Sequence, residues 1–333
     1  MKVGIKKISE LSGFSLATVS NVLNHKKGVS QQTADLILKI ADEIGYLKEN
    51  CIKTIKLVIY KKHGMIVSDT PFFSALIEGV EGECRSRGFA LEICSLDQQS
   101  RDFETVLKGL LRDYTTAILL LATELNEQDM IPFETAISPV MVLDNWFSSM
   151  KYNSVLINNA DAVSGAVRYL ISCGHRKIGY LKSAVSINNF VYRAEGYLSA
   201  MRNAHLEPDK KYTVHLTPTM DGAYQDMCAY LDQNQDLPTA FFADNDIIAF
   251  GAMKALKQHG IHIPEDISMI GFDDMPFCEI SSPSLTTIRV FKQEMGALAV
   301  KNLVDSIEQD NPIKIKAEVC TEFIKRASVK KLD

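Results

Sequence analysis

The sequence predicts a small all-α unit followed by a larger α/β region built from two lobes with parallel sheets. Three observations support this prediction. Apolar side chains recur at helical spacing in residues 5–44, apolar runs alternate with amphipathic segments in residues 57–157, and the same alternation returns from residue 158 onward. Strand–helix–strand alternation is typical of parallel sheets that are covered by helices on both faces. Two successive sets of this kind indicate two similar subdomains.

The N-terminal unit contains three candidate helices. They are residues 5–12, 16–23 and 31–44. Gly13 breaks the first helix, and Ser15 and Ser30 are suitable N-caps because a serine hydroxyl accepts one of the free N–H groups that open a helix. We expect the following residues to face inward: Ile5, Ile8, Leu11, Val19, Val22, Leu23, Leu36, Ile37, Ile40, Ala41 and Ile44.

Two short helices joined by a glycine-containing turn predict a helix-turn-helix, in which the second helix enters the major groove by its N-terminal half. Asn21 offers a paired donor and acceptor to a base edge, and Leu16 and Ala17 suit thymine methyl groups. The residues that suit phosphate contacts are Thr18, Ser20, Asn24 and His25. A three-helix unit with a solvated polar face is the alternative, and periodicity alone leaves both open.

Composition places the chain among ordinary globular proteins, and the charge is unevenly distributed. Of 333 residues, 46% are hydrophobic, which is enough for sizeable cores. The charged fraction of 23% is ordinary for a globular protein. Residues 1–56 hold nine Lys and five acidic residues, so this segment is basic (+4) while the remainder carries −9. A basic head on an acidic body suits a nucleic-acid contact at one end, although random fluctuation over a short segment is the alternative.

Cysteine usage and hydropathy indicate a cytoplasmic protein. The seven cysteines are scattered, odd in number and without CxxC spacing, so we expect reduced thiols and neither disulfides nor a zinc site. No apolar run approaches the roughly 18 residues that a membrane span needs. The N-terminus lacks an apolar segment of signal-peptide length. We therefore expect no membrane partner.

The stretch IKKISELSGFSLATVSNVLN resembles the headpiece of LacI/GalR-type repressors, as do Val29-Ser30 and IADEIGY. The family usually has Arg or His where Asn21 stands, which predicts an operator that departs from the common one. Further segments resemble the effector domain of this family, whose fold is that of periplasmic sugar-binding proteins. They are TPFFSALIEGVE, GHRKIGYL, YRAEGYLSAM, FFADNDIIAFGAMKAL, PEDISMIGFDD and PSLTTIRV. The resemblance implies two Rossmann-like lobes, crossover strands near residues 157, 287 and 318, and a ligand in the cleft.

The resemblance also implies domain boundaries. They are a headpiece at 1–46, a hinge at 47–56, an N-terminal lobe at 57–157 plus 287–317, and a C-terminal lobe at 158–286 plus 318–333. In such repressors a hinge helix carries an apolar wedge into the minor groove. By position Ile55 is the wedge, Ile52 faces the partner hinge and Lys53 approaches phosphate. The usual Pro-Asn and Ala-Arg pairs are absent, and Ile52 and Ile55 alternatively belong to the first strand of the body.

Candidate ligand residues follow the predicted strands, because ligands of open parallel sheets bind beyond the carboxyl ends of the strands. Hydroxyl-rich ligands need planar, bidentate polar groups and an apolar or aromatic surface. The resemblance implies that Asp144, Arg193, Asn245 and Asp273 bind the effector. Phe72, Trp146 and Asn189 complete the predicted effector-binding set as aromatic and amide groups. We expect Asp246 to cap the following helix instead of touching the ligand. Val290 stands where many relatives carry Gln.

Structural roles remain alternatives for several of these residues. Arg193 suits a surface salt bridge, and Asp273 suits a carboxylate that stabilises its own loop. Trp146 suits a core anchor or a subunit contact as well as a sugar face.

Signatures of catalysis are absent from the sequence. GxSxG, GxxxxGK[ST] and GxGxxG do not occur. His259 and His262 form HxxH across a predicted helix end without a third ligand nearby. Asp273 and Asp274 have no obvious proton partner. We expect no enzyme activity, no cofactor and no metal.

Together these expectations describe a sequence-specific DNA-binding transcription regulator of the repressor type. Its partners are double-stranded operator DNA, a small polar effector that is a sugar or sugar derivative, and a second copy of the chain, with a tetramer as a further possibility. Three alternatives remain. They are a regulator of the same fold gated by a protein partner or a non-sugar ligand, an enzyme acting on sugars or nucleosides, and a transport-class binding protein, which the headpiece argues against.

Overall fold

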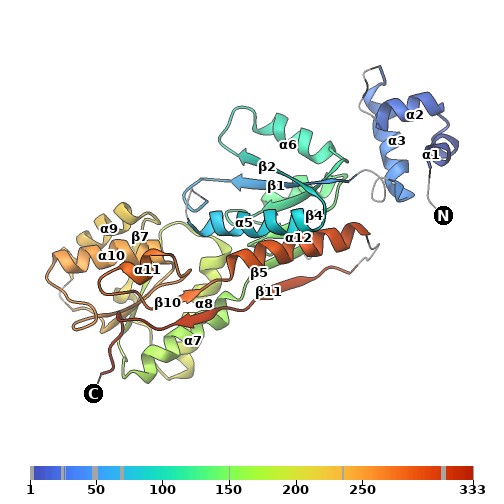
Figure 1. Ribbon diagram of the computed structural model, residues 1–333. Coiled ribbons are helices and arrows are strands. Elements are labelled where there is room, and N and C mark those ends of the chain that lie inside the picture. The colour runs from blue at the N-terminus through green and yellow to red at the C-terminus, as the bar shows by residue number, and fades with distance from the viewer. Residues whose placement is uncertain are drawn as a thin grey trace.

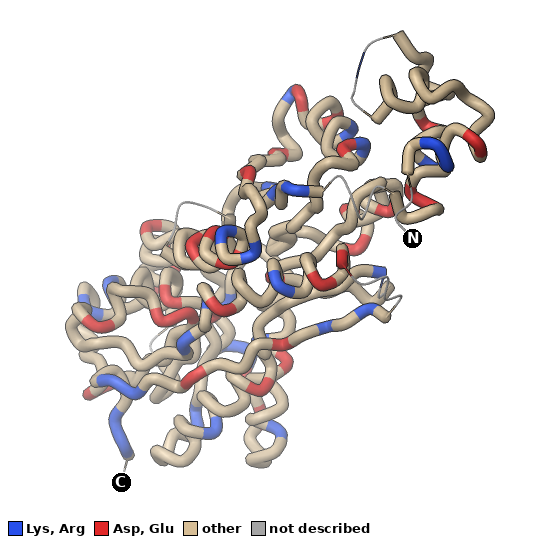
Figure 2. Tube along the Cα trace, turned by 45° about the vertical axis from the view of Figure 1, so that its right-hand side comes forward, with Lys and Arg blue, Asp and Glu red and all other residues tan. Residues whose placement is uncertain are grey.

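The computed structural model describes residues 4–23, 26, 28–46, 52–67, 71–149, 151–234, 236–308 and 313–332. Figure 1 shows a helical headpiece at one end, a first α/β lobe in the middle and a second α/β lobe at the other end, where the chain terminates. Figure 2 shows acidic and basic residues interspersed along the helices of both lobes. No helix in the described ranges is long and apolar enough to cross a membrane.

Within the described residues the headpiece has three helices, as predicted. They are α1 (Ile5–Ser12), α2 (Leu16–Leu23) and α3 (Gln31–Glu43). Gly13 ends α1 with φ 74°, a left-handed conformation that glycine adopts without steric cost. Both expected caps are confirmed, because the Ser15 hydroxyl accepts the Thr18 N–H at 3.1 Å and the Ser30 hydroxyl accepts the Thr33 N–H at 3.3 Å.

The headpiece core buries fewer side chains than the helical spacing of apolar residues predicts. Ile8, Val19 and Ile37 are fully buried, but Leu11 and Leu36 are 50% and 45% exposed, so their predicted inward positions are wrong. A unit of three short helices buries one stripe on each helix, and these two leucines lie outside that stripe. Leu38 is buried instead, at a surface where α3 meets the first lobe.

The first lobe is a six-stranded parallel sheet with the strand order β11-β5-β4-β3-β1-β2. Its strands are β1 (Thr54–Lys61), β2 (Ala90–Asp97), β3 (Thr116–Leu121), β4 (Val140–Leu143), β5 (Asn153–Ile157) and β11 (Lys316–Val319). Its helices are α5 (Pro71–Ser86), α6 (Phe103–Arg112), α12 (Lys292–Glu308) and the 3₁₀ segment η1 (Gln128–Thr135). Every residue of β3 is buried, as expected for a central strand covered on both faces.

The second lobe is a four-stranded parallel sheet with the order β7-β6-β8-β9. Its strands are β6 (Ile178–Ser183), β7 (Thr213–Leu216), β8 (Ala240–Ala243) and β9 (Ser268–Ile270). Its helices are α7 (Asn159–Ser172), α8 (Asn188–Asn203), α9 (Met220–Gln233), α10 (Asp246–Gln258), the short α11 (Phe277–Ile280) and the 3₁₀ turn η2 (Lys210–Tyr212). The predicted fold class, helical headpiece plus two parallel α/β lobes, is confirmed.

The chain passes between the lobes at three places. It leaves the first sheet after β5, returns through β10 (Thr287–Arg289) to α12 and β11, and leaves again through β12 (Glu322–Ile324). β10 and β12 pair antiparallel, with Arg289 opposite Glu322. Each lobe is therefore assembled from segments that are far apart in the sequence.

The wedge role of Ile55 is not supported by the structure. Ile55 lies inside β1, where it is paired with Leu91 and Ala117 and is fully buried. Ile55 instead belongs to the first strand of the body, which was the alternative expectation. Ile52 packs partly buried against the same core, and Lys53 is exposed just before β1. Residues 47–51 of the predicted hinge lie outside the described residues.

One long helix, α12, was not predicted. It packs closely along α5, and small residues make this approach possible. A Cβ atom at Gly79 of α5 would collide with the carbonyl oxygen of Gln293, and one at Gly296 of α12 would collide with that of Leu76. The two helices thus cover one face of the first sheet as a tightly packed pair (Figure 1).

Candidate functional site

A cavity of about 390 Å³ lies between the lobes, beyond the carboxyl ends of their strands. Its polar lining comes from both lobes and comprises Thr123, Asp144, Asn189, Arg193, Thr219, Asn245 and Asp273. Its walls are otherwise mostly apolar, with Phe72, Phe73 and Phe190 among them. A mostly apolar cavity with a few convergent polar groups is typical of small-molecule sites.

Arg193 is the centre of the polar lining. It lies on α8, is 3% exposed and stacks its guanidinium on the Phe272 ring, with Cζ 3.6 Å from the ring centroid. Nε donates to Asn159 Oδ1 at 2.8 Å, and Nη1 donates to the backbone carbonyl oxygen of Asp244. Nη2 lies 3.6 Å from Asp273 Oδ1. These contacts fix the plane of the guanidinium, so Arg193 presents its remaining N–H groups in one orientation.

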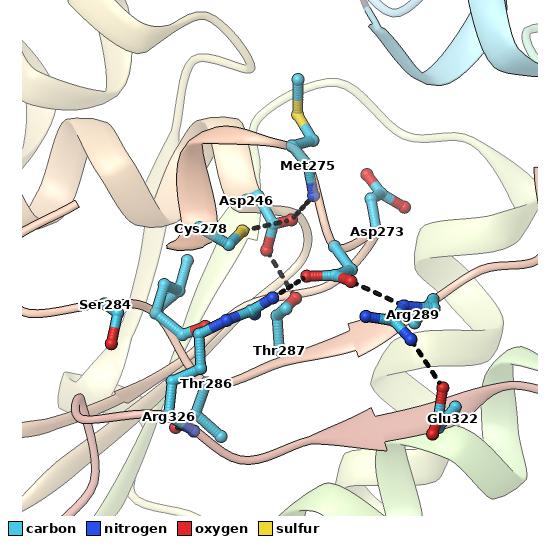
Figure 3. Close-up of polar contacts among 12 residues, drawn as sticks. Asp246, Asp273, Met275, Cys278, Ser284, Thr286, Thr287, Arg289, Glu322 and Arg326 are labelled. Carbon is cyan, nitrogen blue, oxygen red and sulfur yellow. Dashed lines mark hydrogen bonds and ion pairs between the residues drawn. The ribbon is translucent and has the colours of Figure 1, made fainter. Parts of the chain in front are cut away.

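Asp273 follows β9 and faces the cavity from a strained backbone. Asp273 has φ 112° and Asp274 has φ 50°, conformations that are uncommon for residues other than glycine. Asp274 is held by Arg289 Nε at 2.8 Å and by Arg326 Nη2 at 2.7 Å, and Figure 3 shows the Asp273 carboxylate pointing away from both arginines. Within the described residues, Asp273 Oδ1 is buried without a hydrogen-bond partner. Burial raises the pKa of Asp273, against the opposing charges of Arg193 and Lys292.

Asp144 directly follows β4 on the opposite wall and accepts hydrogen bonds from two donors. Its carboxylate accepts the Thr123 hydroxyl at 2.7 Å and Asn189 Nδ2 at 3.0 Å. Burial raises the pKa of Asp144 to about 6, although both hydrogen bonds and Arg193 favour the charged form. Because Asn189 belongs to the second lobe, its hydrogen bond to Asp144 joins the two walls of the cavity.

Asn245 lines the cavity as predicted, but the capping role expected for Asp246 belongs to Asn245. Asn245 lines the cavity, but its Oδ1 also accepts the Ile248 N–H at 2.9 Å, so Asn245 and not Asp246 caps α10. Asp246 is fully buried and accepts Thr287 Oγ1, the Met275 N–H and Cys278 Sγ, as Figure 3 shows. Burial, reinforced by the charge of Asp273, raises the pKa of Asp246 to about 7.

Trp146 does not line the cavity, in contrast to its predicted role. Asp144 has φ 62°, and the Asn145 side chain donates to the carbonyl oxygens of Ala122 at 2.7 Å and Leu125 at 2.9 Å. This turn directs the chain away from the cleft. The Trp146 ring instead faces Lys316, with Nζ 4.2 Å from the ring centroid. The other six predicted effector residues line the cavity, and their contact with a ligand remains a prediction. Val290 is buried in the core.

Sequence reasoning missed Glu124, which shapes one rim of the cavity. Its carboxylate accepts five backbone N–H groups from residues 62–67 at 2.9–3.0 Å. That loop contributes Gly64, Met65 and Ile66 to the cavity lining. Burial raises the pKa of Glu124, but the backbone hydrogen bonds outweigh it, and the pKa is lowered overall. Its position three residues after the apolar strand β3 was the available signal.

The predicted DNA-binding face lies on α2. Leu16 is 52% exposed and Ala17 is exposed, whereas Ser20 and Asn21 are half-buried. Thr18 is half-buried, and its hydroxyl lies 2.9 Å from the Ser15 hydroxyl. Asn24 and His25 lie outside the described residues. The DNA contacts of this set, and of Lys53, remain predictions.

Metal chemistry finds no support in the part of the chain that is described. No group of three or more His, Cys, Asp or Glu side chains is placed to hold an ion there. The HxxH histidines make separate contacts, since His259 Nε2 lies 3.1 Å from Asp232 and His262 Nδ1 lies 3.3 Å from Asp266.

A capped helix-turn-helix joined to a two-lobed domain with a polar cavity at its strand ends defines a DNA-binding regulator that carries a small-molecule site. Family models agree with both parts. Residues 4–49 match the lacI family of bacterial regulatory proteins, and residues 167–329 match the periplasmic binding protein-like domain.

Curated proteins and solved structures extend the similarity over nearly the whole chain. The chain is 30% identical over 329 residues to the HTH-type transcriptional repressor PurR of Pasteurella multocida (98% of each chain) and 31% identical over 310 residues to a ribose operon repressor of Haemophilus influenzae (92% of each). The fold matches a complex of the transcriptional regulator CelR with cellobiose at TM-score 0.75 and 24% identity (98% and 99% covered). It also matches the Lac repressor dimer bound to operator and the anti-inducer ONPF at TM-score 0.73 and 21% identity (99% and 100% covered). The chain belongs to the LacI family of bacterial regulatory proteins, and it is a DNA-binding transcriptional repressor with a small-molecule effector.

Proposed function

We propose that the effector is an uncharged, hydroxyl-rich molecule, a sugar or sugar derivative, and that its binding between the lobes changes the affinity of a homodimer for a palindromic operator. The observation that supports this proposal most directly is the buried Asp273 Oδ1 at the cavity wall, which lacks a hydrogen-bond donor within the described residues. A buried acceptor of this kind is satisfied by a ligand hydroxyl.

The charge of the cavity supports a neutral ligand. Its described lining contains two carboxylates, Asp144 and Asp273, and one guanidinium, Arg193. Arg193 already donates hydrogen bonds to Asn159 and to the Asp244 carbonyl oxygen, and its Nη2 forms an ion pair with Asp273 at 3.6 Å, beyond hydrogen-bond distance. An anionic ligand would face two carboxylates with little free cationic capacity to offset them. A polyol with one apolar face would instead meet phenylalanine rings and bidentate polar groups.

The proposed dimer follows from the symmetry of operators, since two identical headpieces match two half-sites of a palindrome. The relative whose structure is named as a Lac repressor dimer on its operator supports this assembly. Effector and DNA then alter each other's affinity by the same factor, because each favours one arrangement of the lobes. We further propose that the protein acts in the cytoplasm and is a regulator without catalytic activity, as its relatives are regulators.

Calorimetric titration of the full-length protein tests the effector class. The panel contains pentoses including ribose, hexoses, disaccharides including cellobiose, nucleosides, and the phosphorylated form of each sugar. We expect a neutral sugar to bind and its phosphorylated form to bind at least tenfold more weakly. Preference for the phosphorylated form, or for a nucleoside alone, would overturn the proposed class.

Variants then assign the binding to the cavity, and DNA binding tests the consequence. Asp273→Asn should weaken binding of the sugar identified in the panel by tenfold or more, on the basis of one charge-assisted hydrogen bond. Asp266→Asn, an exposed residue of the same lobe, is the matched control and should bind normally. Gel shifts with the DNA upstream of the chain's own gene, with and without that sugar, should show a changed operator affinity.

A further inference from the structure

Tyr114 belongs to the first lobe by sequence but to the headpiece by packing. It lies between α6 and β3 and is 1% exposed. The apolar cluster that buries it is that of the headpiece. The other buried members of this cluster are Ile8, Val19, Val22, Ile37, Leu38 and Ala41. An aromatic side chain of the lobe therefore completes the core of the helix-turn-helix.

The hydroxyl of Tyr114 makes a specific contact with the second helix. It donates to the backbone carbonyl oxygen of Val22 at 2.9 Å. Val22 is in the last turn of α2, where carbonyl groups have no partner within the helix. Tyr114 thus satisfies an end group of the helix that we expect to enter the major groove.

The residue before Tyr114, Asp113, is held by several hydrogen bonds. The Asp113 carboxylate accepts Lys56 Nζ at 3.1 Å and the backbone N–H and hydroxyl of Thr115 at 2.9 and 2.7 Å. The Ser138 hydroxyl donates to the Asp113 carbonyl oxygen at 2.6 Å. Because Lys56 lies in β1, its contact with Asp113 connects the segment that contains Tyr114 to the central sheet.

This docking leaves the predicted DNA-binding face open. Leu16 and Ala17 lie at the opposite end of α2 from Val22 and remain exposed. We propose that Tyr114 is a positioning residue that docks α2 on the first lobe and orients it for operator binding. The contact is a second mechanical connection between lobe and headpiece, beside the segment of chain that joins them.

The expected effect on DNA binding follows from preorganisation. A headpiece that is already oriented loses less rotational freedom when it binds DNA. Removal of the Tyr114 contact with α2 should therefore weaken operator binding. The hydroxyl alone contributes about one net hydrogen bond, which corresponds to a factor of roughly 2–10 in affinity. Loss of the whole ring should cost more than loss of the hydroxyl.

Three full-length variants test the proposal. They are Tyr114→Phe, which removes only the hydrogen bond to Val22, Tyr114→Ala, which removes the ring, and the control Tyr152→Phe. Tyr152 is a matched control because its hydroxyl donates to the Met130 carbonyl oxygen at 3.4 Å within the same lobe, away from the headpiece. The DNA probe is a duplex selected by the wild-type protein from a random pool, and its dissociation constant is measured by fluorescence anisotropy.

Headpiece motion is measured on the same proteins without DNA. ¹⁵N relaxation reports whether residues of α2 tumble with the lobe, and limited trypsin digestion reports the cleavage rate after Lys53. We expect Tyr114→Ala to weaken operator binding by tenfold or more, to let α2 tumble independently and to speed cleavage. Tyr114→Phe should show a smaller change in the same direction and remains informative should the alanine variant not fold. Wild-type relaxation and DNA affinity in both Tyr114 variants, or an equal loss in Tyr152→Phe, would overturn the proposal.

Discussion

Asn189 Nδ2 at the start of α8 donates to Asp144 Oδ1 at the end of β4, and this 3.0 Å hydrogen bond joins the two lobes at the cavity wall. The preceding residue repeats the connection, because Asn188 Nδ2 donates to Asn145 Oδ1 at 2.9 Å. Two consecutive asparagines of one lobe therefore contact two consecutive residues of the other. The relative position of the lobes is set at these side chains as well as at the crossover strands.

Removal of the Asn189 side chain should raise the pKa of Asp144 above its value of about 6. The Asn189 donor favours the charged carboxylate, so its loss leaves burial less opposed. A ¹³C-carboxyl NMR titration of Asn189→Ala measures this pKa directly. Asn188→Ala is the matched control, since Asn188 bonds Asn145 and should leave the Asp144 titration in place. An unchanged or lower pKa in Asn189→Ala would contradict the assignment.

Asp246 should make the stability of the protein depend on pH. Its folded pKa of about 7 lies above the ordinary value of 3.8, so the folded chain holds a proton that the unfolded chain has released between these values. The stabilisation is therefore present at low pH and is lost as the pH rises through about 7. Between pH 5 and 8 the free energy of unfolding should fall by on the order of 2–3 kcal/mol from this group.

Urea unfolding of wild type and Asp246→Asn at pH 5 and 8 isolates this contribution. The buried His175 acts in the opposite direction, because burial lowers its pKa, but it does so in both proteins. The variant should therefore lose less stability than wild type between the two pH values. Equal losses in the two proteins would show that Asp246 is ionised in the folded chain across this range.

Glu124→Gln should loosen the loop of residues 62–67 and destabilise the chain by about 2–4 kcal/mol, since an amide has one acceptor oxygen for the five N–H groups that the carboxylate accepts. Urea unfolding gives the energy, and hydrogen exchange should accelerate in that loop. Glu127→Gln is the control, because its exposed carboxylate accepts the Ser148 hydroxyl and the Ser149 N–H, each at 2.9 Å. Wild-type exchange in Glu124→Gln would argue against this anchoring.

Two glycines of α5 should respond oppositely to alanine. Gly79→Ala places a Cβ against the Gln293 carbonyl oxygen and should cost about 1–3 kcal/mol through overpacking against α12. Gly82→Ala meets nothing within 4 Å and should stabilise the helix by up to about 1 kcal/mol. Urea unfolding of both variants measures the difference. Equal effects at the two positions would mean that α5 and α12 are packed less closely than the structure has them.

Most strands and helices could be predicted because buried parallel strands leave apolar runs in the sequence. Helix α12 was also predictable, since Met295, Ala299, Val300 and Leu303 follow helical spacing between the crossover strands expected near residues 287 and 318. The role of Ile55 could not be decided from the sequence pattern alone. An apolar residue after a polar segment suits a wedge and a strand equally, and only its pairing with β2 and β3 distinguishes them.

The cavity residues were predictable to the extent that strand ends meet at one edge of a sheet. Trp146 failed this rule because the positive φ of Asp144 redirects the chain, and backbone angles of single residues leave no sequence pattern. Asp246 is held away from the expected cap by Thr287 and Met275, which are distant in sequence. Glu124 was missed because its partners are also distant in sequence and are backbone amides, which any residue supplies.

The three passages of the chain between the lobes have a consequence for how such a protein can be recombined. The first sheet ends in β11, so its edge strand arrives only with the final residues of the chain, after the second sheet is complete. Neither lobe can be exchanged for a foreign one by a single cut and splice. The headpiece is one continuous stretch and can be exchanged in this way. The replacement headpiece must accept the tyrosine of the first lobe in its core. New operator specificities are therefore easier to graft onto this body than new effector lobes.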